Sequence, residues 1–481
     1  MESLTNGGHR HRIGLFSIGL DTYWEQFPSL EQRLSGYNRE IASRLEGFGT
    51  DVVNLGMVDD TEKAVAAGHA FRQADVDLIF LHVSTYALSS VVLPVVRRVR
   101  VPVVVLNLTP QASLDYEAFN RMKDRRTMTQ EWLAHCQACS MPEISNVFRR
   151  CGVDFHQVTG TMEEKDQAWS EIADWVMASR VVHAMAHNRL GILGHYYSGM
   201  LDIYSDLTLQ ASVFGTVVEI LEADELSALR REVSSEDVDR QTAFLRDAFE
   251  VESDCSQGEL ERAARTSLAL DQLVKRHHLG SLAYYYKGNG IPANEDTFSS
   301  IIVGASLLTG SGIPVAGELE VKNVQAMKIL DLLGAGGSFT EYYANDYLDD
   351  VILMGHDGPG HIAIASGRPR LRPLEVYHGK VGRGLSIEMS VRHGPVTLLS
   401  VAEDGRGSLK FVVAEGASVP GPILEIGNTN SRYRFPIGSR AFMEAWNREG
   451  PAHHCAIGVG HRHAQLAKIA ALLGIECARV C

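Results

Sequence analysis

The sequence has no hydrophobic run long enough to cross a membrane, which takes about 20 mostly apolar residues in succession. Its first twelve residues, MESLTNGGHRHR, also lack the apolar core of a secretory signal peptide. We therefore expect a cytoplasmic protein that has no membrane partner.

An excess of positive charge is missing too. The 45 lysines and arginines are outnumbered by 59 aspartates and glutamates, so the formal net charge is −14. A surface of this sign disfavours non-specific binding to nucleic acid or to an anionic membrane. The seven cysteines are few and odd in number, so they do not form the paired framework of a disulfide-rich secreted domain.

Nucleotide-binding motifs are absent where an α/β sheet would carry them. The turn after the first expected strand reads Gly19-Leu-Asp-Thr-Tyr-Trp24 and contains no GxGxxG, which disfavours a dinucleotide cofactor. In an open α/β sheet such a turn lines the ligand crevice. Tyr23 could therefore stack on a sugar substrate, although packing inside the protein is an equal alternative. The turn Gly194-His-Tyr-Tyr-Ser-Gly199, after the strand expected at 189–193, could also reach a site.

At 481 residues the chain is too long for one ordinary core. Near-continuous apolar runs alternate with helical patterns, as in buried parallel sheets, and the first four fall at 13–20, 52–55, 78–83 and 101–108. Later, short β-branched strands separated by turn residues indicate an antiparallel sheet or barrel, and they fall at 387–391, 397–401 and 410–414. We predict an α/β protein with two doubly wound α/β domains and a β-rich C-terminal domain, with boundaries 1–185, 186–335 and 336–481.

Acidic and histidine side chains gather at expected element ends between residues 310 and 361. Glu318 lies where a loop gives way to a helical pattern, Glu341 follows a Gly-Gly-Ser-Phe run, and His356 ends an apolar strand-like segment. His454, in a loop marked by glycine and proline, is a fourth candidate. Two carboxylates and two imidazoles suit a divalent cation such as Mn²⁺. Their spacing matches no compact metal motif, so a solvated or hydrogen-bonded side chain remains an alternative for each.

Four short motifs carry these residues, and they follow one another as Ala316-Gly-Glu318, Ser338-Phe-Thr-Glu-Tyr342, Leu353-Met-Gly-His356 and Ala452-His-His454. In order and spacing they resemble the metal-site motifs of the L-arabinose isomerases, and the resemblance spans most of the chain. It implies that Glu318, Glu341, His356 and His454 bind Mn²⁺ or another divalent cation. It also implies that the two glutamates carry the acid–base chemistry.

Two further residues follow from the resemblance. The family usually continues its metal histidine with Met-Leu-Glu, whereas Asp357-Gly-Pro-Gly-His361 stands here. Because the related L-fucose isomerases use an aspartate ligand, Asp357 could join or replace His356, or contact the substrate. His135 matches a histidine that reaches the active site of a neighbouring subunit, which implies a homo-oligomer, either a trimer, a tetramer or a hexamer. A loop histidine without a role is the alternative for His135.

Together these observations predict a metal-dependent aldose–ketose isomerase that acts on an open-chain monosaccharide through an enediol intermediate. One alternative keeps the site and changes the substrate or outcome, to isomerisation or epimerisation of a deoxy, acidic or sulfo sugar. Another is a non-catalytic sugar-binding protein.

Overall fold

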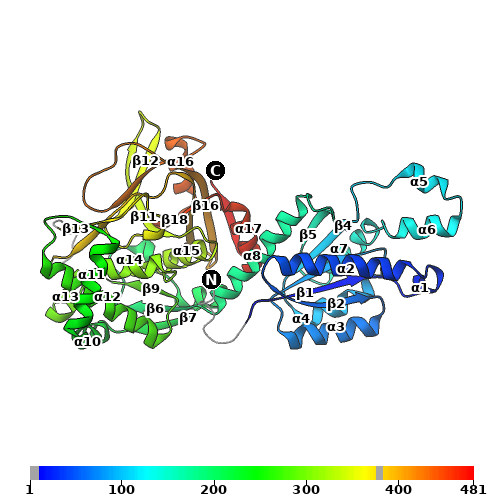
Figure 1. The fold of residues 1–481 in the computed structure, drawn as a ribbon, viewed down its shortest axis with the longest axis horizontal. Helices are drawn as coiled ribbons and strands as arrows, with labels where there is room; N and C mark the ends of the chain where they lie inside the picture. Colours follow the sequence, from blue (N-terminus) through cyan, green and yellow to red (C-terminus); the bar gives the residue numbers. More distant parts are fainter. Residues whose placement is uncertain (1–9, 286, 375–382) are drawn as a thin grey trace. The chain divides into compact units, whose positions relative to one another are not determined.

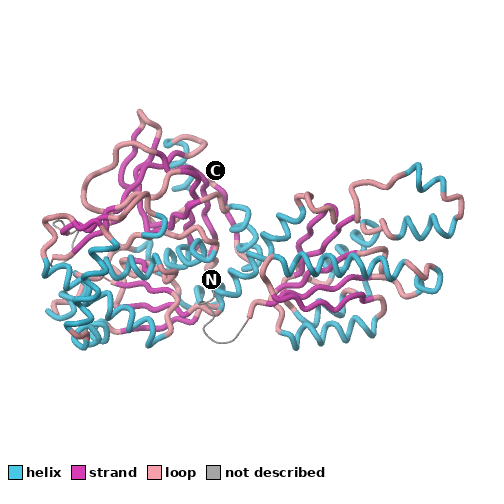
Figure 2. Tube along the Cα trace, in the orientation of Figure 1, coloured by secondary structure: helices cyan, strands magenta, loops and turns pink. Residues whose placement is uncertain are grey.

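The computed structural model describes residues 10–285, 287–374 and 383–481. The described chain forms two compact units, here called the N-terminal unit (10–183) and the C-terminal unit (184–481). Figure 1 labels their helices and strands, and Figure 2 marks the strands in magenta. Across the described ranges, no helix combines the length and the apolar character that a membrane crossing requires.

The N-terminal unit is built on a five-stranded parallel sheet in the order β2-β1-β3-β4-β5. Every residue of β3 is buried, as the apolar run LIFLHV predicts for a central parallel strand. Its strands are β1 (Arg12–Ile18), β2 (Asp51–Val58), β3 (Leu78–Val83), β4 (Val103–Thr109) and β5 (Phe155–Thr161). Its helices are α1 (Thr22–Gln26), α2 (Leu30–Gly47), α3 (Thr61–Ala74), α4 (Leu93–Val99), α5 (Tyr116–Arg121), α6 (Arg125–Leu133), α7 (Met141–Arg150) and α8 (Ala168–Ala186).

The C-terminal unit begins with a second parallel sheet, in the order β10-β9-β6-β7. Its strands are β6 (Arg189–Leu193), β7 (Val217–Leu221), β9 (Ser281–Tyr284) and β10 (Val315–Ala316). The helices of this region are α9 (Leu207–Phe214), α10 (Ala223–Glu232), α11 (Ser235–Ala248), α12 (Gln257–His277), α13 (Pro292–Ser299), α14 (Ile302–Gly310) and α15 (Val321–Leu332). A small third sheet joins β8 (Glu250–Val251), β13 (Arg370–Pro373) and β14 (Leu385–Glu388).

The remaining strands of the C-terminal unit form a closed antiparallel barrel. Pairing runs in the order β15-β18-β11-β12-β17-β16, and β16 pairs again with β15. These strands are β11 (Ser338–Asp346), β12 (Val351–His356), β15 (Gly394–Glu403), β16 (Leu409–Val419), β17 (Thr429–Arg434) and β18 (His454–Val459). Strand β19 (Glu476–Arg479) adds to β16, and helices α16 (Ser439–Arg448) and α17 (His463–Leu473) complete the chain.

The predicted fold class is confirmed, because parallel α/β sheets are followed by a strand-rich, antiparallel C-terminal region. Of the two alternatives for that region, sheet or barrel, the strands form the barrel. The division into three domains stays a prediction.

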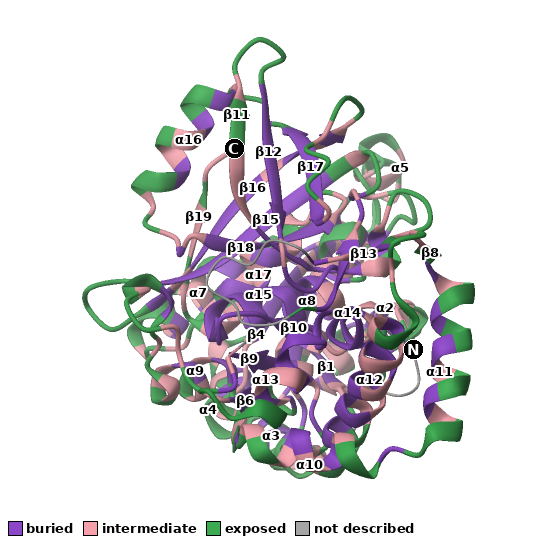
Figure 3. Cartoon of the chain, turned by 90° about the vertical axis from the view of Figure 1, so that its left-hand side faces the viewer, coloured by how far each residue is buried: buried purple, intermediate pink, exposed green. Residues whose placement is uncertain are grey.

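Helix α15 connects the two kinds of sheet within the C-terminal unit. All of its residues from Val321 to Leu330 are buried, including four polar ones, as Figure 3 shows by colour. It contacts β9 and β10 of the parallel sheet and β11, β15 and β18 of the barrel. A helix that is buried all round must be packed on every side, so α15 is the common core element of both layers.

The turn between α15 and β11 depends on a glycine at Gly337. Its φ is +145°, and an added Cβ would lie 2.5 Å from the carbonyl oxygen of Met327 on α15. Gly334, in the same turn, has a φ of +69° and nothing within 4 Å of an added Cβ. An alanine at Gly337 would therefore add a steric clash to backbone strain, whereas an alanine at Gly334 would cause backbone strain alone.

We expect Gly337→Ala to lower the free energy of unfolding by about 3 kcal/mol or more, since strain and overpacking add. Gly334→Ala, the matched control, should cost only about 1–2 kcal/mol through its left-handed backbone. Urea denaturation of both variants measures the difference. Equal losses would show that the approach to Met327 does not constrain the turn.

Candidate functional site

Three adjacent barrel strands bring three of the predicted metal ligands together. Glu341 on β11 pairs with His454, the first residue of β18, and with Gly355 on β12, the neighbour of His356. One ligand atom from each of Glu341, His356 and His454 lies within 4.8 Å of the others. The barrel register therefore assembles a carboxylate and two imidazoles from strands up to 113 positions apart in sequence (454 minus 341).

Glu318 approaches the same place from the turn between β10 and α15. Glu318 and Leu319 have φ values of 57° and 60°, both in the left-handed region. This backbone conformation is unfavourable for residues other than glycine, and it is found where the surrounding structure enforces it. Here the Leu319 amide donates to the carbonyl oxygen of Tyr284 at the end of β9 (2.9 Å), which holds the turn against the parallel sheet. Glu318 Oε2 then lies 3.6 Å from His454 Nε2.

His454 belongs to two groups of candidate ligands. Besides Glu341 and His356, it lies with Glu318 and His453 in a second set whose ligand atoms are within 4.8 Å of one another. All four residues predicted as ligands, Glu318, Glu341, His356 and His454, thus meet around one imidazole. Their roles at the site stay a prediction.

His454 and Glu318 carry buried atoms that could act as ligands of a cation. His454 is 1% exposed, and neither of its ring nitrogens has a hydrogen-bond partner among the described residues. Burial lowers the pKa of His454 to about 3, so its ring stays neutral, as a metal ligand requires. Glu318 Oε2 is likewise buried without a hydrogen-bond partner in the described chain. Buried polar atoms normally have a hydrogen-bond partner. The unpartnered ring nitrogens of His454 and Oε2 of Glu318 therefore suit a bound divalent cation as ligand atoms.

Phe339 fixes the two histidine rings relative to each other. This fully buried ring lies 4.4 Å from the ring centroid of His356, edge-on, and 4.4 Å from that of His454. His356 Nδ1 also accepts from the Gly358 amide (2.9 Å) and lies 3.5 Å from Asp357 Oδ1. The His356 ring is therefore held by Phe339 and by the Gly358 amide.

Asp357 lies beside the ligand group but is not among the atoms that cluster within 4.8 Å. Burial, followed by the charges of Glu341 and Asp357, raises the pKa of Tyr343 far above its usual value. Both carboxylates therefore lie near Tyr343. Asp357 stays a predicted substrate contact or additional ligand.

Three residues around the site had no place in the predicted ligand set: Asp202, Glu320 and His453. Glu320 is fully buried, and its Oε2 lies 3.7 Å from His454 Nδ1. Burial, partly offset by Lys322, raises the pKa of Glu320 to about 8. The sequence offers one signal for it, the repeat Glu-Leu-Glu at 318–320, which places a second carboxylate two residues after the first.

His453 contacts carboxylates on both ring nitrogens. Its Nδ1 lies 2.6 Å from Asp202 Oδ2, and its Nε2 lies 3.8 Å from Glu318 Oε2. Burial opposes the charged form, but the two carboxylates outweigh it and raise the pKa of His453 to about 9. Asp202 could not be found from sequence, because 251 positions separate it from His453.

An aromatic wall adjoins Glu318 at the ends of β6 and β9. Burial, Tyr197 and Glu318 raise the pKa of Tyr285. The rings of His195 and Tyr197 lie 4.3 Å and 6.1 Å from that of Tyr285. The turn Gly194–Gly199 therefore reaches the neighbourhood of Glu318, and its rings are suited to stacking on a sugar.

Tyr23 and His135 belong to the N-terminal unit. The Tyr23 ring on α1 contacts Phe27, 6.2 Å between centroids. His135 Nε2 lies 3.3 Å from Glu131 Oε1, and Glu131 forms an ion pair with Arg33 (2.6 Å). Their contact with substrate stays a prediction.

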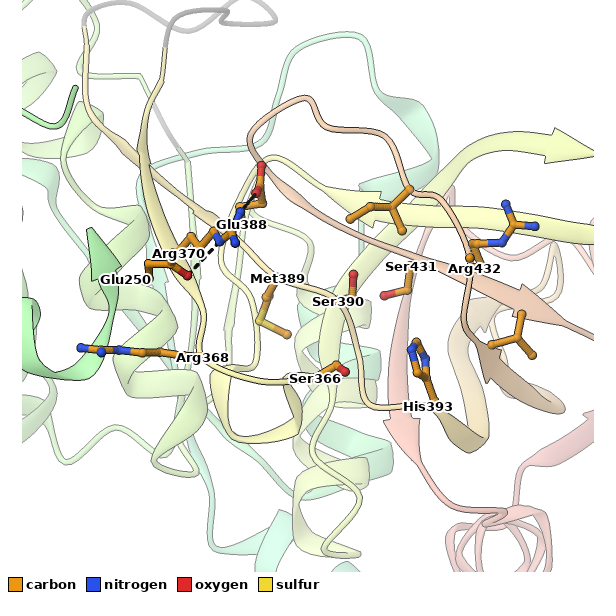
Figure 4. Close-up of a pocket in the computed structure, with 13 residues that line it drawn as sticks. Glu250, Ser366, Arg368, Arg370, Glu388, Met389, Ser390, His393, Ser431 and Arg432 are labelled. Atoms are coloured by element: carbon orange, nitrogen blue, oxygen red, sulfur yellow. Dashed lines mark hydrogen bonds and ion pairs between the residues drawn. The ribbon is translucent and has the colours of Figure 1, made fainter. Parts of the chain in front are cut away.

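A separate cavity of about 450 Å³ in the C-terminal unit contains none of the predicted site residues. Figure 4 shows serine hydroxyls and His393 facing it, with Arg370 bound to Glu250 at one side. Arg370 Nε donates to Glu250 Oε2 (2.9 Å), and Arg368 donates to backbone carbonyls at the end of α11. Since these cations are engaged by the protein, the cavity offers weaker chemistry than the Glu/His cluster.

No family model matches the chain. In sequence, however, it is 25% identical to an L-arabinose isomerase from Nocardioides sp. (strain ATCC BAA-499 / JS614) over 350 residues, which cover 69% of this chain and 68% of that protein. The predicted distant resemblance to the L-arabinose isomerases is confirmed.

Among solved structures, the chain is similar to an ABC transporter solute binding protein from Burkholderia multivorans, with 13% identity, 64% of this chain and 97% of that chain covered, and a TM-score of 0.16. It is also similar to a periplasmic solute binding protein with bound D-allose from Actinobacillus succinogenes 130z, with 14% identity, 67% and 90% covered, and a TM-score of 0.16. At TM-scores this low, neither likeness bears on fold or function.

His454 gives the sharpest test of cation binding because it belongs to both ligand groups. We expect Mn²⁺ to stabilise the wild-type protein by about 2.7 kcal/mol at roughly 100 times its dissociation constant. His454→Ala should abolish most of this gain, whereas His393→Ala, an exposed histidine of the same unit, should keep it. Thermal unfolding with and without Mn²⁺ measures the effect. An undiminished gain in His454→Ala would remove His454 from the cation site.

Proposed function

We propose that this protein is a divalent-metal-dependent aldose–ketose isomerase that acts on an open-chain monosaccharide. The observation that carries the proposal is that the buried His454 lies in one group of candidate ligand atoms with Glu341 and His356 and in a second group with Glu318. These four positions are the ones that the resemblance to the L-arabinose isomerases marks as ligands. Two carboxylates and two imidazoles, some with unpartnered buried atoms, fit Mn²⁺.

The isomerisation moves one proton from C2 to C1 of the sugar and another between the oxygens on these carbons. A carboxylate within hydrogen-bond reach must take the carbon proton and return it, through an enediol intermediate. Glu318 and Glu341 supply the pair, one acting on carbon and the other on the hydroxyl protons. A divalent cation held by the four residues would supply Lewis-acid stabilisation of negative charge on the sugar oxygens.

The surroundings of the two glutamates suit an open-chain sugar. Tyr285 lies near Glu318 and packs against the rings of His195 and Tyr197, while Asp357 follows His356 and, like Glu341, lies near Tyr343. Tyr23 and His135 are proposed substrate contacts, His135 from a neighbouring subunit of a homo-oligomer. A cytoplasmic location belongs to the same proposal.

The departure at Asp357 favours a second candidate, an isomerase or epimerase of a modified sugar. Where the L-arabinose isomerases usually carry methionine after their metal histidine, this chain carries a carboxylate. Product chromatography from Mn²⁺-supplemented reactions with pentoses, hexoses, deoxy sugars, acidic sugars and sulfo sugars distinguishes the two. Sugar binding by calorimetry without turnover of any substrate would instead indicate a non-catalytic binding protein.

A glutamate shuttle makes a specific prediction about solvent. The proton on the carboxyl group exchanges with water, so a reaction in deuterated water should place deuterium at C1 of the ketose. We expect Glu318→Gln and Glu341→Gln to lower kcat by about 10²–10⁴-fold. Glu449→Gln, which removes a carboxylate paired with Lys410 elsewhere in this unit, should leave kcat unchanged. Mass spectrometry and NMR of the product measure the label. Product that carries no solvent deuterium, and whose C1 retains the hydrogen from C2 of the substrate, would mean a hydride shift.

The shared-site proposal for His135 can be tested by mixing subunits. His135→Ala and Glu318→Gln should each be inactive alone. After subunit exchange, some sites would combine an intact His135 from one chain with an intact Glu318 from another, and activity should return. Exchange is verified by native mass spectrometry. Exchanged oligomers that remain inactive would contradict a site shared between subunits.

A further inference from the structure

Asp202 reaches the ligand group from a turn far away in sequence. It lies in the short 3₁₀ turn Leu201–Ile203, between β6 and α9. Its Oδ2 accepts from the His453 amide (2.9 Å) and lies 2.6 Å from His453 Nδ1. One carboxylate oxygen therefore engages both the backbone and the ring of the residue that precedes His454.

The Asp202 turn is itself fixed by Lys322, the second residue of α15. Lys322 is 4% exposed, and its Nζ donates to the carbonyl oxygens of Asp202 (2.6 Å) and Tyr204 (3.2 Å). The Gly199 amide donates to the Tyr204 hydroxyl (3.1 Å), which braces the same segment. A buried ammonium group needs hydrogen-bond acceptors for its N–H groups. These two hydrogen bonds from Lys322 therefore hold the Asp202 turn in one position.

The His453 ring extends from Asp202 towards the candidate ligands Glu318 and His454. With Nδ1 occupied by Asp202, its Nε2 faces Glu318 Oε2 at 3.8 Å. The ring also lies against that of His454, 3.8 Å between centroids. The contacts thus form one chain, from Lys322 through the Asp202 turn to His453 and on to Glu318.

We infer that Asp202 is a positioning residue that acts through His453 to orient the Glu318 carboxylate. This inference rests on the proposed function and adds a residue that no site motif contains. Partners beyond the direct ligands commonly fix ligand orientation, and their loss costs about 10–100-fold in metal affinity or activity.

A purely structural ion pair would behave differently. The side chains of Asp202 and His453 are 42% and 36% exposed, and exposed ion pairs contribute only about 0.2–1 kcal/mol to stability. Asp206, four residues on, provides the matched control, because its carboxylate caps α9 by accepting from the amides of Thr208 and Leu209. Removing Asp206 should lower stability without disturbing His453.

The experiment compares Asp202→Ala, Asp202→Asn and Asp206→Ala in the full chain. Mn²⁺ affinity is measured by calorimetry without sugar, and kcat and KM are measured separately with the sugar that the wild type turns over. We expect Asp202→Ala to weaken Mn²⁺ binding and lower kcat, each by about tenfold or more, with a smaller change in KM. Asp202→Asn keeps an acceptor for the His453 amide and should recover part of the loss. Asp206→Ala should lower only the melting temperature.

A double-mutant cycle decides whether Asp202 acts through His453. In a His453→Ala background, Asp202→Ala should cause no further loss, because coupled residues are not additive. Additive losses, or wild-type Mn²⁺ affinity and kcat in Asp202→Ala, would overturn the inference. Its failure is distinguishable from that of the proposed function, which fails only if the wild type isomerises no sugar or if Glu318→Gln and Glu341→Gln remain active. If the wild type isomerises no sugar, the Mn²⁺ affinities alone still decide the role of Asp202.

Discussion

The burial of α15 on every side is the constraint on which the site depends. The helix packs against β9 and β10 of the parallel sheet and against β11, β15 and β18 of the barrel. Because protein interiors are close-packed, sliding or rotating the helix would leave apolar residues unpacked on one side and create steric clashes on the other. Its first turn is therefore fixed relative to both sheets. Glu318 lies three residues before the helix begins, so its distance from the barrel histidines is set by packing.

The same arrangement stores unfavourable energy at the site. Two successive left-handed residues, Glu318 and Leu319, each cost about 1–3 kcal/mol. The unpartnered buried atoms of Glu318, Glu320 and His454 add further cost, about 1–3 kcal/mol per unsatisfied group. Only a well-packed framework can hold such groups in place. A divalent cation would offset part of this cost by supplying the missing partner, so binding and local stability are linked.

The sequence predicted what depends on local pattern. Apolar runs such as LIFLHV indicated the buried parallel strands. The four motifs contain Glu318, Glu341, His356 and His454, which fall into two groups of candidate ligands that share His454. It could not predict the closure of the barrel, because the return pairing of β15 with β16 leaves the same alternating pattern as an open sheet. Asp202 was missed for a related reason. Its contact with His453 arises from tertiary packing, and neither residue carries a local signal of the other.

The site lies where two architectures end together. Strands β9 and β10 of the parallel sheet end at Tyr284 and Ala316, and ligand sites in open α/β sheets form beyond such carboxyl ends. From this edge come Tyr285, the strained turn with Glu318, and the β6 turn with its aromatic rings. The barrel contributes Glu341, His356 and His454 from neighbouring strands at one end. The parallel sheet thus supplies Glu318 and the neighbouring aromatic rings, while the barrel supplies Glu341 and both imidazoles. Of the two glutamates in the proposed proton shuttle, Glu318 comes from the turn after β10 and Glu341 from β11, so the shuttle requires both layers, and α15 is the element that packs against each of them.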